Sequence, residues 1–212
     1  MNEELNILII SAASIGFFHT LLGPDHYLPF VAISKARNWS QPKTLLLTVL
    51  CGFGHVLSSV VIGLIGVAFG TALIKLEFIE SFRGDLAAWA LIAFGLVYLI
   101  WGLRRAYKNK HPHHHHHDKK NITPWVLFIV FVLGPCEPLI PILMYPAAKS
   151  SLTGMILVAS VFSIVTIATM TSIVYILIGG FKLFKLPSLE RYSHALAGFV
   201  ILLCGIAIQF GL

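Results

Sequence analysis

Two matching stretches of the chain decide its fold: Leu22-Gly23-Pro24-Asp25-His26-Tyr27-Leu28-Pro29 and Leu133-Gly134-Pro135-Cys136-Glu137-Pro138-Leu139-Ile140-Pro141. Each stretch lies inside a long apolar segment. A proline within a helix removes a backbone hydrogen bond and clashes with the preceding turn, so each Gly-Pro pair predicts a break in a helix. Both breaks carry ionisable or soft side chains, which makes them the first candidates for a functional site.

The composition around these stretches is that of a membrane protein. The chain has 212 residues, of which 57% are hydrophobic and only 11% are charged. Soluble domains are about 45–50% apolar and about 25% charged, so a soluble fold, a disordered chain or a secreted disulfide scaffold is not expected. The N-terminus is acidic where a cleavable signal peptide would be basic. The apolar runs are long and continuous, which favours helices over a β-barrel.

Six apolar segments predict six transmembrane helices. They cover about 7–34, 44–73, 86–103, 124–147, 152–179 and 194–212. The three cysteines, Cys51, Cys136 and Cys204, all fall inside these segments, which does not suggest an extracellular disulfide framework.

The distribution of basic residues predicts the orientation in the membrane. The loops after the first, third and fifth segments contain Lys35, Arg37, Lys43, Arg104, Arg105, Lys108, Lys110, Lys119, Lys120, Lys182, Lys185 and Arg191. The opposite loops have only Lys75, Arg83 and Lys149. Because basic loops stay in the cytoplasm, we expect a multi-pass protein of the cytoplasmic (inner) membrane with both termini extracytoplasmic. The net charge of +6 therefore reflects topology rather than nucleic-acid binding.

The two breaks also indicate an internal repeat. Gly23 and Gly134 are 111 positions apart, about half the chain. Three spans are an odd number, so a second copy would cross the membrane in the opposite sense, as in many secondary transporters. We predict an all-α integral membrane domain over 1–212, with six helices in a 3+3 inverted repeat and helices 1 and 4 broken. The first repeat covers 1–105, a His-rich cytoplasmic loop covers 106–121, and the second repeat covers 122–212.

Ionisable residues within the predicted spans are the candidate site. A carboxylate near the middle of a bilayer is costly unless it is paired or solvated, and Asp25 and Glu137 are the acids that the sequence places deep in apolar segments. Imidazole, carboxylate and thiolate groups suit nickel, cobalt, zinc or copper better than magnesium or calcium. The candidate metal ligands are His19, Asp25, His26, His55, Cys136 and Glu137. Since such ligands must lose protons to bind a metal, exchange against protons is chemically available.

The loop after the third segment is rich in histidine. His111, His113, His114, His115, His116 and His117 lie there, a composition that binds metals. We expect this loop to capture metal at the cytoplasmic mouth, which fits export better than uptake. His194, near the start of the sixth segment, is expected to be an interfacial residue rather than a ligand.

These motifs resemble the nickel/cobalt efflux transporters of the NicO/RcnA type. The short six-span form is equally similar to UreH-like and TauE/SafE-like membrane domains, all within the LysE-type superfamily, which also includes the DsbD/CcdA membrane domains. The resemblance covers nearly the whole chain and implies the inverted-repeat fold and a metal role for His19, Asp25, His26 and His55. Five residues separate His19 from Asp25, whereas the nickel/cobalt permease signature has four, and this difference argues against high-affinity uptake.

We therefore expect a transporter, not an enzyme, that exports a divalent transition metal as its substrate and needs no organic cofactor. Two alternatives are left open: a DsbD/CcdA-like thiol-redox protein, which would need a partner for Cys136 such as Cys51, and an exporter of sulfite or another small anion. The expected partners are the lipid bilayer and the metal ion, with no nucleic acid; the sequence also leaves a homo-oligomer open.

Overall fold

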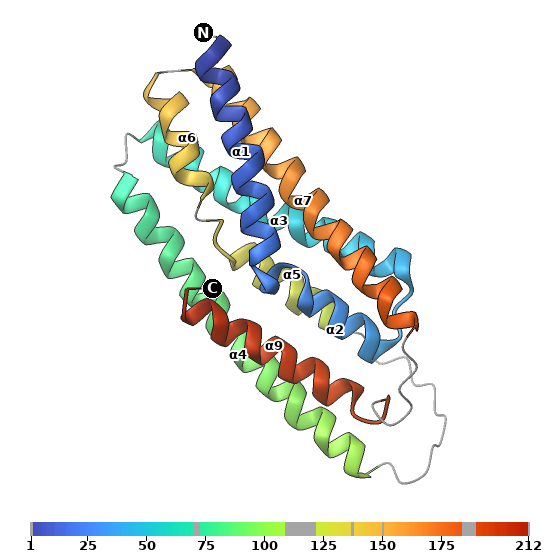
Figure 1. The fold of residues 1–212 in the computed structure, drawn as a ribbon. Helices are drawn as coiled ribbons and strands as arrows, with labels where there is room; N and C mark the ends of the chain where they lie inside the picture. Colours follow the sequence, from blue (N-terminus) through green and yellow to red (C-terminus); the bar gives the residue numbers. More distant parts are fainter. Residues whose placement is uncertain are drawn as a thin grey trace.

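The computed structural model of the chain is helical throughout its described residues, which are 2–69, 73–108, 122–136, 138–149, 151–183 and 190–211. The elements follow the order α1 (Asn2–Leu22), η1 (Pro24–His26), α2 (Leu28–Arg37), α3 (Gln41–Ala68), α4 (Leu73–Lys108), α5 (Thr123–Leu133), α6 (Leu139–Ala148), α7 (Leu152–Leu183) and α9 (Ser193–Gln209). The helices form an elongated bundle in which α1 and α7 lie side by side, as do α4 and α9 (Figure 1).

Four of these helices are long and apolar enough to cross a membrane: Glu3–Leu22, Gln41–Val67, Ile74–Lys108 and Leu152–Gly180. Two shorter apolar helices are Thr123–Leu133 and Ser193–Gln209. Many large apolar side chains are exposed, including Ile7, Phe53, Trp89 and Ile176. An outer surface of this kind is suited to lipid rather than to water.

Both predicted helix breaks are confirmed. α1 ends at Leu22, and a short 3₁₀ turn that begins at Pro24 separates it from α2. α5 ends at Leu133 and α6 begins at Leu139. In each case the chain leaves the helix at a Gly-Pro pair, as expected from the missing proline N–H.

The predicted third span, 86–103, is too short. α4 begins at Leu73 and continues to Lys108, so Lys75 and Arg83 are helical residues rather than loop residues. The charges in the first part of this helix lower its hydropathy, but Arg83 forms a buried ion pair with Glu80. A charge that is neutralised by a neighbour one turn away does not end a helix, and a hydropathy pattern cannot register that pairing.

Small residues bring the helices into close contact. On α1 the buried positions include Ala12, Gly16 and Thr20, which are four residues apart and face α7. On α9, a Cβ atom added to Gly205 would lie 2.8 Å from the backbone nitrogen of Ile92 on α4. Glycine and alanine allow two backbones to approach in this way, which is the usual means of packing helices in membranes.

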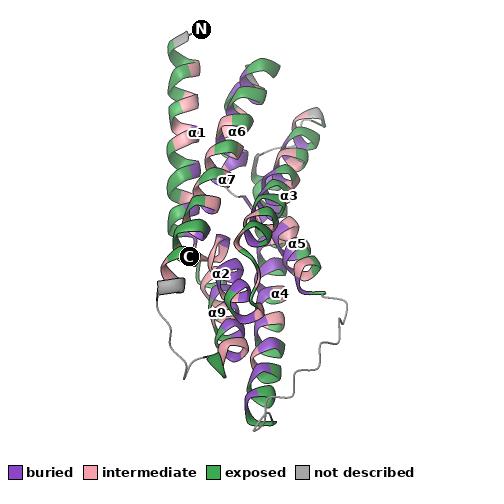
Figure 2. Ribbon diagram, turned by 90° about the vertical axis from the view of Figure 1, so that its right-hand side faces the viewer, coloured by how far each residue is buried: buried purple, intermediate pink, exposed green. Residues whose placement is uncertain are grey.

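The buried side chains form two apolar clusters, and burial is densest where α2, α4 and α9 meet (Figure 2). One cluster contains Phe30, Cys51 and Ile201, and the other contains Val56, Cys136 and Phe162. The break between α5 and α6 connects the two clusters, since Val130 and Phe131 belong to the first and Cys136 and Leu139 to the second.

Candidate metal centre

Three histidines from three separate segments meet at the first break. His19 lies in the last turn of α1, His26 ends η1, and His55 is in the middle of α3. One ring nitrogen from each lies within 4.8 Å of those of the other two. The centroid of the His26 ring lies 4.8 Å from that of His19 and 5.1 Å from that of His55. In both pairs the planes of the two rings are close to perpendicular.

The break is what places two of these histidines together. In an unbroken helix His19 and His26 would lie two turns apart, about 10 Å along the axis. At the turn over Gly23 and Pro24, the Gly23 nitrogen donates to the His19 carbonyl oxygen at 3.0 Å, which closes the last turn of α1, and the His26 nitrogen donates to the Gly23 carbonyl oxygen at 3.1 Å. The rings of the two histidines are thereby brought into edge-to-face contact.

The Nε2 atoms of all three histidines are buried and have no hydrogen-bond partner among the described residues. His26 and His55 are each only 4% exposed. Burying a polar nitrogen without a partner costs about 1–3 kcal/mol, so three such atoms in one place call for a ligand.

Hydrogen bonds at the opposite ring nitrogens set the tautomers. The Nδ1 of His26 lies 3.1 Å from the Gly23 carbonyl oxygen and 3.2 Å from Asp25 Oδ1. The Nδ1 of His55 lies 3.2 Å from the Phe131 carbonyl oxygen. A carbonyl oxygen can only accept, so Nδ1 donates in both rings, and each neutral ring keeps its lone pair on Nε2. Metal-binding histidines are oriented in this way, through a carbonyl or a carboxylate at the second nitrogen.

A side chain larger than glycine would press on a histidine at both breaks, strongly at Gly23 and slightly at Gly134. A Cβ atom on Gly23 would lie 2.6 Å from His26 Nδ1, and one on Gly134 would lie 3.2 Å from His55 Nδ1. The glycine at each break therefore leaves room for the ring of a different histidine of the same group.

The three histidines and Asp25 border a cleft of about 630 Å³. Apolar side chains from α1, α4 and α5, including Phe18, Leu91 and Val130, form much of its wall. A mostly apolar cleft with a few converging polar atoms is typical of a binding site for a small ligand.

The remaining predicted ligands are placed differently. The Asp25 carboxylate contacts His26 Nδ1 and so orients a candidate ligand. Cys136 is buried in the apolar cluster with Leu139 and Phe162, and it is not part of the group of three ring nitrogens. Glu137 and the loop histidines His111, His113, His114, His115, His116 and His117 lie outside the described residues. His194 is apart from the site, with its Nδ1 2.9 Å from the Tyr98 hydroxyl.

Sequence reasoning missed the most deeply buried acid that the structure describes. Glu80 is 1% exposed and pairs with Arg83, whose side chain is 12% exposed. The available signal was the spacing of three residues between opposite charges, which places both on one face of a helix. The prediction that Asp25 and Glu137 were the acids deep in apolar segments was therefore incomplete.

Comparisons with profiles of protein families, with curated proteins and with solved structures gave no match.

Proposed function

We propose that this protein is a membrane transporter that exports a divalent transition-metal ion, with nickel or cobalt as the expected substrate. The observation that carries the proposal is a group of three histidines whose ring nitrogens, one from each, lie within 4.8 Å of one another and whose Nε2 atoms are buried without a hydrogen-bond partner among the described residues. Imidazole nitrogens are the ligands preferred by nickel, cobalt, zinc and copper, and they bind in the neutral form, in which donation from Nδ1 leaves the lone pair on Nε2.

The three histidines could share one ion if their rings move together. Nitrogens bound at ~2.1 Å to one tetrahedral ion lie about 3.4 Å apart, so nitrogens within 4.8 Å of one another must approach by up to about 1.4 Å. The cleft beside the histidines leaves room for water or other donors to complete the coordination. A site with few protein ligands can release its ion again, as a transporter requires.

The helical arrangement supports six spans in two inverted halves. In this proposal α1 and α2 together form one broken span and α5 and α6 form another, with α3, α4, α7 and α9 as the remaining four. Each contact of the first half has a counterpart in the second half. The packing of α1 on α7 corresponds to that of α5 on α3, and the packing of α2 on α9 corresponds to that of α6 on α4. A pattern of this kind is expected of an inverted repeat with its site at the broken helices.

The direction of transport and the topology rest on the sequence. The excess of basic residues predicts that the histidine-rich segment that follows α4 lies in the cytoplasm. A metal-binding loop on that side would raise the local ion concentration at the entrance for export. Proton exchange follows from the chemistry, because protons and the metal compete for the same ring nitrogens.

Neither alternative from the sequence is favoured by the site. A thiol-redox function would need two cooperating thiols, but Cys51 and Cys136 lie in different apolar clusters. An anion exporter would have Asp25 beside its substrate, and the like charge would oppose binding.

The proposal is tested with purified protein in proteoliposomes that enclose a dye responsive to nickel and cobalt. We expect the wild type to carry metal into the proteoliposomes, and we expect most of this flux to be lost in the single variants His19→Gln, His26→Gln and His55→Gln. His194→Gln is the matched control, since that ring is hydrogen-bonded to Tyr98 away from the cleft.

Equal metal flux in all four variants and the wild type would refute the metal site. No metal flux by the wild type, together with chelator-insensitive sulfite counterflow, would support the anion alternative instead. Equal thiol labelling of Cys51 and Cys136 before and after oxidation would exclude the redox alternative.

A further inference from the structure

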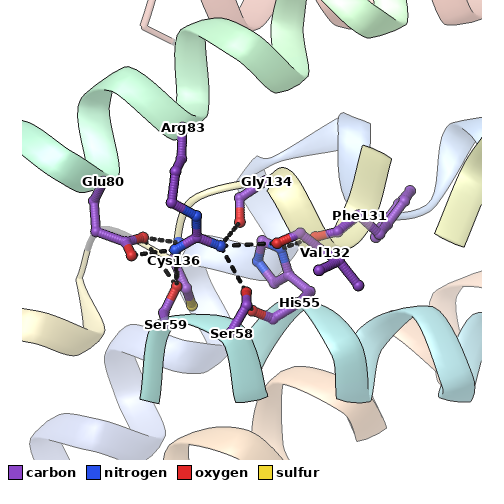
Figure 3. Close-up of polar contacts among 9 residues, drawn as sticks. All are labelled: His55, Ser58, Ser59, Glu80, Arg83, Phe131, Val132, Gly134 and Cys136. Atoms are coloured by element: carbon purple, nitrogen blue, oxygen red, sulfur yellow. Dashed lines mark hydrogen bonds and ion pairs between the residues drawn. The ribbon is translucent and has the colours of Figure 1, made fainter. Parts of the chain in front are cut away.

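A buried ion pair on α4 reaches the second helix break. Arg83 Nη1 donates to Glu80 Oε1 one turn away, and both side chains point across to α3 and to the segment between α5 and α6 (Figure 3). Ser59 also donates to Glu80 Oε2 at 2.9 Å. The pair is outside the group of three histidines, and nothing in the proposed metal chemistry uses it directly.

The pair replaces a hydrogen bond that the break removes. In a continuous helix the Val132 carbonyl oxygen would accept from the Cys136 nitrogen, four residues on. Here Arg83 Nη2 donates to the Val132 carbonyl oxygen at 2.8 Å and to that of Gly134 at 3.3 Å. The Cys136 nitrogen instead donates to Glu80 Oε2 at 3.1 Å and to Ser59 Oγ at 3.2 Å.

The signs of the two charges match the ends that they contact. The C-terminal end of α5 presents carbonyl oxygens and a partial negative charge, which a guanidinium stabilises. The chain that enters α6 presents N–H groups and a partial positive charge, which a carboxylate stabilises. Irregular backbone inside a membrane persists only where the protein satisfies its polar groups, and the Glu80–Arg83 pair does so on both sides of this break.

The same segment orients His55. Pro135 has no N–H, so the Phe131 carbonyl oxygen lacks its helical partner four residues on. That oxygen accepts from the Gly134 nitrogen at 3.2 Å and from His55 Nδ1 at 3.2 Å. The position of the Phe131 carbonyl therefore fixes both the tautomer and the direction of the His55 ring.

A second set of hydrogen bonds links Arg83 to the backbone of His55 through Ser58. Arg83 Nη2 donates to Ser58 Oγ at 2.6 Å, and Ser58 Oγ donates to the His55 carbonyl oxygen at 2.7 Å. Arg83 is thus linked through the Ser58 hydroxyl to the backbone that carries His55, and it binds an α5 carbonyl next to the one that holds the His55 ring (Figure 3).

We propose that Arg83 and Glu80 are positioning residues that hold the α5–α6 break so that His55 directs Nε2 toward His19 and His26. The expected effect on metal binding rests on the proposed function, whereas the expected effect on the orientation of the His55 ring does not. Removal of the arginine frees the α5 carbonyls and leaves the carboxylate of Glu80 buried without its cation. The His55 ring then loses its fixed partner.

The test uses two measurements on the full chain in detergent. Titration with cobalt alone, followed by its absorption bands, gives the affinity and the coordination of the ion. Nitrogen-15 spectra of histidine-labelled, metal-free protein give the tautomer of His55, whose signal is identified by its absence in His55→Gln. Arg83→Gln removes the charge, and Arg83→Lys keeps it without the planar fork that reaches several acceptors.

We expect roughly tenfold weaker cobalt binding in Arg83→Gln, the lower end of the effect of outer ligand-orienting groups, with altered cobalt bands and a mixture of His55 tautomers. Arg83→Lys should fall between this variant and the wild type. Glu77→Gln and Arg104→Gln are matched controls, because both residues are exposed on the same helix and should leave both measurements unchanged.

Each outcome decides a separate point. Wild-type affinity and an unchanged His55 tautomer in a folded Arg83 variant would overturn the inference and leave the pair a purely structural element. If the wild type binds no cobalt, the proposed function fails; the inference then stands if the Arg83 variants change the tautomer and falls if they do not. Should Arg83→Gln fail to fold, Arg83→Lys supplies the same comparison.

Discussion

Replacement of Gly23 by alanine should weaken metal binding, even though alanine can adopt the backbone conformation of this residue. Gly23 has φ −88° and ψ 91°, a region open to alanine. Its Cβ, however, would lie 2.6 Å from His26 Nδ1 and 3.0 Å from the His19 carbonyl oxygen. Ordinary contact begins at 3.4 Å, so the His26 ring must withdraw by about 0.8 Å.

A shift of that size is large for a metal ligand. Ligand distances are held to roughly 0.2 Å, and loss of an outer orienting contact costs about 10–100-fold in affinity. We therefore expect cobalt or nickel binding to weaken by at least tenfold, about 1.4 kcal/mol. The assay is isothermal titration of the folded protein in detergent, with the thermal midpoint measured in parallel.

Two other glycines make the comparison quantitative. A Cβ atom on Gly134 would lie 3.2 Å from His55 Nδ1, which requires a shift of only about 0.2 Å, so Gly134→Ala should have a smaller effect. A Cβ atom on Gly179 would meet nothing within 4 Å, so Gly179→Ala should leave affinity unchanged. Equal affinities for folded Gly23→Ala and Gly179→Ala would refute the reasoning.

Three further outcomes follow from the structure. Asp25→Asn should lower metal affinity about tenfold, because a neutral amide oxygen is a weaker acceptor for His26 Nδ1, as titration with nickel will measure. Gly205→Ala should lower the thermal midpoint, since its Cβ would press on the Ile92 backbone, and overpacking of this kind costs about 1–3 kcal/mol. Metal affinity should fall steadily as pH is lowered, because protons compete for the ring nitrogens, and titration at a series of pH values will record this.

Each of these has an outcome that contradicts it. A wild-type affinity for Asp25→Asn would mean that the Gly23 carbonyl alone orients His26. An unchanged midpoint for Gly205→Ala would mean that α4 and α9 separate at little cost. Metal binding that does not depend on pH would argue against histidine ligands.

The sequence by itself determined the features that depend on neighbours along the chain. Its apolar runs predicted helices for a bilayer, and the proline after Gly23 and the proline after Gly134 predicted where two of them break. The imidazoles were visible as unusual residues in apolar segments. All of these follow from local chemistry: side-chain polarity and the missing proline N–H act wherever the residue lies.

Only the tertiary structure decided which of these residues act together. It brought one ring nitrogen each of His19, His26 and His55 to within 4.8 Å of one another. It also placed the Asp25 carboxylate beside His26 Nδ1 and buried Cys136 among apolar side chains. It also buried Glu80 beside a break 56 positions further along the chain. A charge can be buried only if distant backbone groups supply its partners, and the hydropathy of its own segment carries no information about those partners.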